Sequence, residues 1–270
     1  MRRSKVKAKL SRGEPVLVPA LHFTDPSIYE LTSLMGFDCI WMDLEHHGYS
    51  VETAGQLMRA ARVGGADVMA RPAKGEFMRM GRLLEAGAQG IMYPRCDDAA
   101  EAAEVVRWSK FAPLGRRGFD GGNSDMPFCS LPIDHYVREA NAETFVVIQI
   151  EELRAVDEAR AIAAVEGVDV LFIGPADLSI TSGVPGQFDH PLIHESIRKV
   201  AEAARLAGKV WGTTSGSLER TRQLLELGAR FICHGCDLVF VKAGLEVIRR
   251  EFSPLGFTFD DRLGQNRDNA

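Results

Sequence analysis

The stretch EGVDVLFIGPADLS, residues 166–179, contains the pattern that decides the fold. Gly167 follows a helical segment, and a short, mostly apolar run comes directly after it. Glycine just past a helix end adopts the left-handed cap conformation that other residues resist. A short run that is apolar on both faces is typical of a parallel strand covered on both sides. The stretch therefore predicts the end of a helix, a buried parallel strand and the start of another helix.

The same pattern recurs along the chain. The other copies are GFDCIWMD (36–43), GGADVMARP (64–72), GAQGIMYPR (87–95), GKVWGTTS (208–215) and GARFICHG (228–235). Two more strands, EPVLVPALH (14–22) and TFVVIQIE (144–151), fit the series without the glycine, and amphipathic helical patterns lie between strands, as at 51–63, 76–87 and 218–228. Strand–helix alternation repeated about eight times predicts an α/β protein with a (β/α)8 TIM barrel. A doubly wound open sheet is the alternative, but it needs a phosphate-binding glycine fingerprint that follows a strand, and GFDGGNSD (118–125) does not.

The length of 270 residues suits a single barrel domain, since such barrels run to about 250 residues. We expect a basic N-terminal segment (1–13), the barrel (14–252) and a polar, frayed tail (253–270). Residues 112–135 are rich in Gly, Pro and Asp and lack a period, which predicts a long loop of functional or mobile character. This loop follows the helix after the fourth strand, so we expect its anchor on the helix side of the barrel.

Composition excludes several classes of partner. The net charge of −5 gives no reason to expect nucleic acid or an anionic membrane surface. No run of about 18 apolar residues is present, so we expect no membrane span. The start, MRRSKVKAKLSRGE, has no apolar core of a secretory signal, and the five cysteines lie mostly in apolar runs, which favours a cytoplasmic location.

Polar residues stand where the predicted strands end. They are His22, Asp43, Glu45, His46, Arg71, Arg95, Gln149, Glu151, Asp177, Thr213, Thr214 and His234. Active-site groups of a barrel lie at the C-terminal ends of its strands, and ionisable residues are rarely buried unpaired. The alternative is a polar rim without function, because solvent also begins at the strand ends. Together these residues predict an active site.

Glu151 and Asp177 close runs that should otherwise be apolar. Paired carboxylates suit a hard divalent cation such as Mg²⁺ or Mn²⁺. Asp177 has a second interpretation, as a cap of the helical turn after GPA. The backbone N–H groups of GPAD can also bind an anion such as a substrate carboxylate.

Three further features carry chemistry. In DLEHH, His46 beside a carboxylate is a candidate general base, although a solvated loop explains the segment equally well. Arg71 can neutralise an oxyanion or form a salt bridge across the rim. Cys233 and Cys236 form a single CxxC pair, which lacks the second pair of a structural zinc site, so packing is favoured over a redox dithiol.

Four of these motifs, in this order, give a resemblance to a known family. Asp43, Glu45 and His46 meet an Asp-x-Glu-His pattern and Arg71 meets an RPA motif. QIE (149–151) and GPADLS (174–179) follow. Over roughly residues 14–250 the chain resembles the metal-dependent pyruvate aldolases typified by 4-hydroxy-2-oxoheptanedioate aldolase, which are related to 2-dehydro-3-deoxyglucarate aldolase.

The resemblance implies roles for the ligands of metal and pyruvate. Glu151 and Asp177 would bind Mg²⁺, Mn²⁺ or Co²⁺, and pyruvate would chelate the ion through its keto and carboxylate oxygens. The N–H groups of Ala176 and Asp177 would hold the carboxylate. Gln149 would support the water shell of the metal.

It also implies the reaction, a reversible cleavage of a 4-hydroxy-2-oxo acid to pyruvate and an aldehyde through a pyruvate enolate. His46, oriented by Asp43, would be the base, and Arg71 would stabilise the enolate oxygen. The alternatives are an oxaloacetate decarboxylase, an acyl-CoA lyase or a non-catalytic barrel that binds 2-oxo acids. A Schiff-base route needs a lysine at a strand end, for which Lys74 is the only candidate.

Finally, the resemblance implies a homohexamer in which the last helix is exchanged between subunits. Residues 237–252, DLVFVKAGLEVIRREF, are apolar around much of the predicted helix, more than one barrel face needs.

Overall fold

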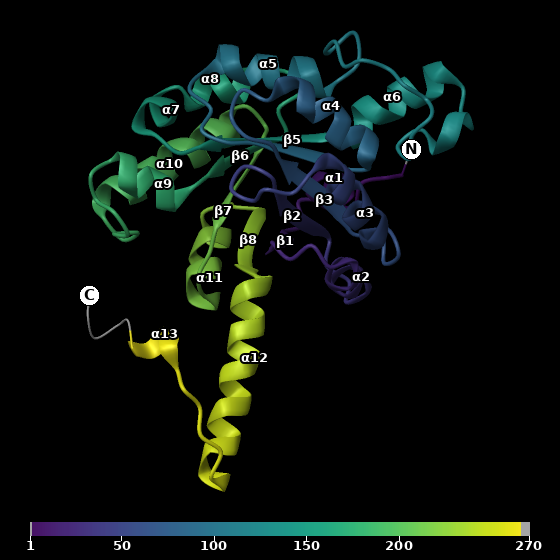
Figure 1. The fold of residues 1–270 in the computed structure, drawn as a ribbon. Coiled ribbons are helices and arrows are strands. Elements are labelled where there is room, and N and C mark those ends of the chain that lie inside the picture. Colours follow the sequence, from purple (N-terminus) through teal and green to yellow (C-terminus); the bar gives the residue numbers. More distant parts are fainter. Residues whose placement is uncertain (1, 266–270) are drawn as a thin grey trace.

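The computed structural model describes residues 2–265 and contains a closed barrel of eight parallel strands in chain order, with β1 paired to β8 (Figure 1). The strands are β1 (Val16–Leu21), β2 (Cys39–Asp43), β3 (Asp67–Arg71), β4 (Gly90–Tyr93), β5 (Phe145–Ile150), β6 (Val170–Ile173), β7 (Val210–Thr214) and β8 (Phe231–Cys236). Each lies within one of the eight runs expected from sequence, except that β8 extends one residue further. The predicted TIM barrel is confirmed.

Helices alternate with the strands. They are α1 (Lys5–Ser11), α2 (Pro26–Leu34), α3 (Val51–Ala61), α4 (Phe77–Ala86), α5 (Ala99–Ser109), α6 (Ile133–Glu143), α7 (Leu153–Asp157), α8 (Ala159–Ala164), α9 (Pro175–Thr181), α10 (Pro191–Leu206), α11 (Leu218–Glu226), α12 (Asp237–Phe252) and α13 (Arg262–Gln265). Two short 3-10 turns, η1 (Pro127–Cys129) and η2 (Ser253–Leu255), complete the described elements. The part of the expected tail beyond residue 265 lies outside the described residues.

Side chains alternate along each strand between the barrel interior and the layer under the helices. One buried apolar cluster takes side chains from seven strands, and the half-buried Val210 of β7 packs against it, so the cluster fills the interior. Its members include Val18, Cys39, Met69, Met92, Phe145, Val147, Phe172, Phe231 and Cys233. The intervening residues, such as Ile148 and Ile150 of β5, pack in a second cluster with the helices. At the C-terminal ends the inward positions become polar, so the dry interior ends in a polar mouth.

Helix α1 packs at the opposite end of the barrel. Val6 is fully buried in the interior cluster. Its N–H donates to Asp67 Oδ2 at 3.0 Å, and the Ser4 hydroxyl donates to the same oxygen at 2.6 Å. Asp67 is the first residue of β3. The basic segment expected ahead of the barrel thus contributes a helix that packs at its bottom.

The loop 112–135 is anchored at this same end. Arg62 Nη1 donates to the Ser124 carbonyl at 3.1 Å, and the Ser124 hydroxyl donates to the Ala86 carbonyl at 3.1 Å. Arg62 and Ala86 stand at the C-terminal ends of α3 and α4. The expected anchor on the helix side is confirmed, and these contacts hold the loop at the end of the barrel away from the strand C-termini.

Helix α12 projects away from the barrel (Figure 1). Asp237 is its only buried residue, and it exposes large apolar side chains that include Leu238, Phe240, Val241, Leu245, Ile248 and Phe252. Because α12 does not lie over the strands before it, Leu17 on the outer side of β1 is 43% exposed. Within residues 2–265 no helix is long and apolar enough to cross a membrane.

Candidate active site

A buried ion pair between neighbouring strands lies at the barrel mouth. Asp43 and Arg71 end β2 and β3 and are register partners, so their side chains point to the same side. Arg71 Nη2 donates to Asp43 Oδ2 at 2.7 Å and Nε donates to Oδ1 at 2.9 Å, while the guanidinium lies 4.6 Å from the centre of the Trp41 ring. Burial alone would raise the pKa of Asp43, but the bonds and charge of Arg71 more than offset it, so this pKa is lowered. The two hydrogen bonds therefore hold the opposite charges of Asp43 and Arg71 in a fixed geometry.

The ion pair continues through an amide to a second carboxylate. Arg71 Nη1 donates to Gln149 Oε1 at 3.3 Å, and Gln149 Nε2 donates to Glu151 Oε1 at 3.0 Å. All three residues are at most 6% exposed. Gln149 and Glu151 point inward because they continue the alternation of Phe145 and Val147. The predicted residues of β3 and β5 therefore form one connected network.

Glu151 is buried at a close approach of two strand ends. The Arg95 N–H donates to its Oε2 at 2.9 Å. Burial, reinforced by the charge of Asp177, raises the pKa of Glu151 to about 7. A Cβ on Gly174 would lie 2.1 Å from Glu151 Oε1, so only glycine leaves room for this carboxylate. The all-oxygen donors of Glu151 and Asp177, in a cradle that a side chain would fill, fit a hard divalent metal.

Asp177 lies inside the first turn of α9. The N-cap of this helix is Gly174, and no side-chain capping bond is formed there. Asp177 therefore does not have the capping role that the sequence left open, and its negative charge acts on Glu151. Ala176, the residue before it, is exposed.

The two histidines after β2 are placed differently from each other. The His46 side chain is 61% exposed, with Nε2 3.7 Å from Glu45 Oε2, and only its backbone N–H approaches Asp43 Oδ1, at 3.5 Å. His47 Nε2 lies 4.0 Å from Asp43 Oδ2, and its ring stacks on His22 with 4.2 Å between centroids. The ring beside Asp43 is thus that of His47, a contact that sequence reasoning missed.

Glu45 connects the two arginines of the mouth. Its Oε2 lies 3.3 Å from Arg71 Nε and its Oε1 lies 3.0 Å from Arg95 Nη2. The Glu45 side chain is 5% exposed, whereas that of Arg95 is 48% exposed. Two of the predicted rim residues therefore extend the network around Arg71.

Lys74 is held by carboxylates outside this network. Its Nζ lies 2.9 Å from Asp97 Oδ2 and 3.2 Å from Glu101 Oε2. Burial alone would lower the pKa of Lys74, but these two acids more than offset it and raise the pKa. A Schiff-base lysine must be a neutral amine, so these contacts disfavour Lys74 in that role.

Two expected rim residues point away from the mouth. His234 alternates with the inward Cys233, and its exposed ring bonds the Ser215 carbonyl at 2.6 Å on the outer side of β8. Thr213 alternates with Gly212 and donates to the Ile173 carbonyl at 2.9 Å. The expectation that both face the site was wrong, because strand alternation carries them outward. Cys233 is buried in the interior, as the packing interpretation expects.

The chain matches a known family and several known proteins over most of its length. The profile of the family described as HpcH/HpaI aldolase/citrate lyase matches residues 21–243. A hydroxypyruvate/pyruvate aldolase from Delftia acidovorans is 35% identical over 237 residues, which cover 87% of each chain. A 4-hydroxy-2-oxo-heptane-1,7-dioate aldolase from Shigella sonnei is 31% identical and covers 91% of this chain and 94% of its own.

A solved structure is similar to this chain over most of its length. The crystal structure of an HpcH/HpaI aldolase from Desulfitobacterium hafniense superposes with a TM-score of 0.84 and 32% identity, covering 90% of this chain and 96% of that one. The range matched by the family profile, residues 21–243, includes Asp43, Arg71, Gln149 and Glu151. This chain, a TIM-barrel carbon–carbon lyase, belongs to the HpcH/HpaI aldolase/citrate lyase family.

Proposed function

We propose that this protein cleaves a 4-hydroxy-2-oxo acid reversibly to pyruvate and an aldehyde. The observation that carries the proposal is the buried chain from Asp43 through Arg71 and Gln149 to Glu151, a carboxylate on which the charge of Asp177 acts. It combines a fixed cation, Arg71, with a carboxylate pair that would hold a metal ion. Both positive charges would stabilise an enolate intermediate. The relatives named as aldolases of hydroxypyruvate, pyruvate and 4-hydroxy-2-oxo-heptane-1,7-dioate support it.

Glu151 and Asp177 would hold the divalent metal, Mg²⁺, Mn²⁺ or Co²⁺. When bound there, such an ion supplies Lewis-acid stabilisation of negative charge on the substrate. Gln149 donates to Glu151 and so fixes the direction of that carboxylate. The N–H groups of Ala176 and Asp177, in the first turn of α9, would orient the substrate carboxylate.

A histidine would transfer the proton, and Arg71 would stabilise the negative charge that develops. The base takes the proton from the C4 hydroxyl, the C3–C4 bond breaks and its electrons form the enolate of pyruvate as the aldehyde leaves. Arg71 would stabilise the oxygen on which the negative charge develops, because Asp43 and Gln149 hold its guanidinium in place. A proton added at C3 then gives pyruvate.

His46 is our proposed base, from its place in the Asp-x-Glu-His motif. His46→Ala should lower kcat by about 10²-fold or more, as expected for a general acid–base group. His47→Ala should have a much smaller effect, because its ring is engaged with His22. Steady-state kinetics of both variants checks this. A reversed order would assign the base to His47, the ring next to Asp43.

We propose that α12 covers β1 and β8 of a second copy of the chain, in a homo-oligomer that the family resemblance makes a hexamer. The exposed apolar side chains of α12 and the exposed Leu17 support this exchange. Sedimentation should therefore give an oligomer, and Leu245→Asp with Ile248→Asp should dissociate it. Leu206→Asp, at an exposed leucine of α10, is the matched control. A stable, active monomer of the unchanged protein would contradict the assembly.

The proposed reaction is tested with pyruvate and a panel of aldehydes in the presence of Mg²⁺, Mn²⁺ or Co²⁺. Formation of a 4-hydroxy-2-oxo acid supports it. Binding of pyruvate without any product would identify a 2-oxo-acid sensor, and loss of CO₂ from oxaloacetate alone would identify a decarboxylase. We place the enzyme in the cytoplasm, which is reducing, since all five cysteines are free.

A further inference from the structure

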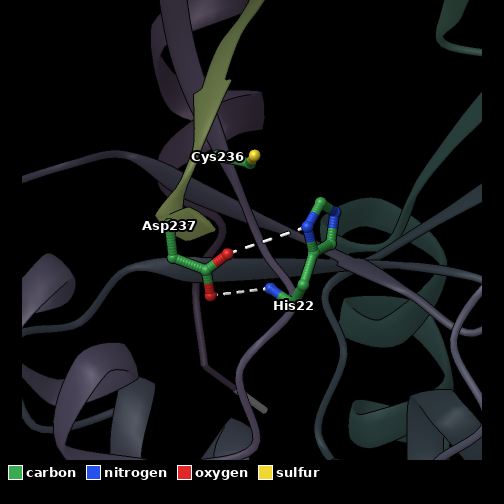
Figure 2. Close-up of side chains that lie close together, drawn as sticks. All are labelled: His22, Cys236 and Asp237. Atoms are coloured by element: carbon green, nitrogen blue, oxygen red, sulfur yellow. Dashed lines mark hydrogen bonds and ion pairs between the residues drawn. The ribbon is translucent and has the colours of Figure 1, made fainter. Parts of the chain in front are cut away.

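We propose that His22, Cys236 and Asp237 form a second metal site, which binds Zn²⁺ and is separate from Glu151 and Asp177. The three residues lie where β1 ends, β8 ends and α12 begins, and Figure 2 shows their side chains gathered together. One ligand atom from each lies within 4.8 Å of the others. They belong to the strands that close the barrel, whereas Glu151 follows β5.

An irregularity in β8 brings Cys236 to the inner side. Cys233 pairs with Val18 and Cys236 pairs with Ala20, so β8 has one residue more than β1 between these pairs. The extra residue reverses the alternation, and without it Cys236 would point outward like His234. Gly235, with φ of 68°, adopts the left-handed conformation that this bulge requires. His22 follows Ala20 by two positions and so shares its side of the strand.

Asp237 is held in place as a ligand must be. It is 1% exposed, and its Oδ2 accepts the backbone N–H groups of His22 at 2.8 Å and Phe23 at 2.7 Å. Its other oxygen, Oδ1, lies 3.7 Å from His22 Nδ1 (Figure 2). Around a tetrahedral zinc, with bonds to N and O of about 2.1 Å, the two atoms would be about 3.4 Å apart. The observed separation needs a shift of only a few tenths of an ångström.

His22 Nδ1 gives an independent indication. This atom is buried and has no hydrogen-bond partner among residues 2–265. A buried polar atom without a partner is costly and rare, so it points to a ligand that would satisfy it. The His22 ring is also fixed from its other face by the stacked ring of His47.

The donor set selects the class of ion. A set of imidazole nitrogen, thiolate sulfur and carboxylate oxygen favours Zn²⁺ and disfavours Mg²⁺, which takes oxygen ligands. Glu151 and Asp177 offer oxygen alone. The two sites should therefore bind different metals in one subunit, and a thiolate bond distinguishes them.

The experiment uses Co²⁺ as a spectroscopic probe of the metal-stripped, full-length protein. A bond between cobalt and thiolate gives an intense near-ultraviolet charge-transfer band, and an all-oxygen site gives none. The unchanged protein should show this band with the intensity of one cobalt–thiolate bond per chain, even when further Co²⁺ fills the site of Glu151 and Asp177, and Zn²⁺ should remove it where excess Mg²⁺ does not. Cys236→Ser should abolish the band. Cys129→Ser, at an exposed cysteine in η1, should leave it unchanged.

Two results would overturn the proposal. One is the absence of the band in the unchanged protein, which does not depend on whether any variant folds. The other is a band that survives in Cys236→Ser. His22→Gln is the second variant, and it should weaken cobalt binding while circular dichroism shows a folded barrel. Retention of the full band in His22→Gln would also contradict the site.

Discussion

Asp177→Ala should abolish turnover even in excess divalent metal. The enolate would lose the cation that balances its charge, and Lewis-acid stabilisation is worth several kcal/mol, so we expect a loss of at least about 10³-fold in kcat. A chelator should likewise abolish the activity of the unchanged enzyme, and Mg²⁺, Mn²⁺ or Co²⁺ should restore it. Rates measured with pyruvate and an accepted aldehyde check both results. Asp189→Ala, which removes a carboxylate that is 92% exposed, is the control and should have little effect.

Borohydride separates this mechanism from lysine chemistry. With pyruvate present, the reagent should leave the enzyme active and its mass unchanged, because no imine forms. Lys74 is ion-paired to Asp97 and Glu101 and is therefore held in its protonated form. A pyruvate-sized adduct on Lys74, with activity that survives chelation, would overturn the metal mechanism and leave the barrel unaffected.

Arg71→Met should reduce both catalysis and stability. Loss of one preorganised donor to a developing oxyanion costs about 10²- to 10³-fold in kcat. Asp43, which is 3% exposed, would also be left as a buried charge without its partner, and breaking such a pair costs about 3–5 kcal/mol in the free energy of unfolding. Kinetics and urea unfolding measure the two losses.

A double variant separates these two effects. Arg71→Met with Asp43→Asn removes both charges and should recover much of the stability, but it should not recover the activity. Arg95→Met is the matched control, since the Arg95 side chain is half exposed and its ion pair with Glu45 should be worth no more than about 1 kcal/mol. Full activity in Arg71→Met would remove this residue from the mechanism.

The fold was predictable because its signals are local. Four strands follow a helix whose C-cap residue is a glycine or directly precedes one, and Gly36, Gly87, Gly208 and Gly228 all have the positive φ that such an ending requires. Before β3 and β6 the glycine with positive φ lies further past the helix, at Gly65 and Gly167. The direction of α12 was not predictable in the same way. Its apolar circumference indicated a second contact, but no local pattern shows whether a helix returns to its own barrel or projects from it (Figure 1).

Prediction of the site succeeded for side chains that face the barrel interior and failed for side chains that face outward at the same strand ends. Asp43, Arg71, Gln149 and Glu151 take inward positions at the ends of their strands and meet as expected. His234 does not, because it alternates with the inward Cys233 and so points outward, which its place at a strand end does not reveal. The His46 ring lies near Glu45, its neighbour in the chain, and the His47 ring stacks on His22, which is remote in the sequence. Neither contact follows from the strand pattern. Their individual roles stay a prediction.

Substitutions at positions 43 and 71 are coupled in evolution, because the register of β2 and β3 pairs these two residues. The two residues face each other across adjacent strands, and each satisfies the charge of the other in a place where both side chains are largely buried. A substitution at either position alone leaves an uncompensated buried ion, so selection would remove it before a second change could arise. Descendants of this barrel that acquire another chemistry are therefore expected to keep both residues or to replace them together.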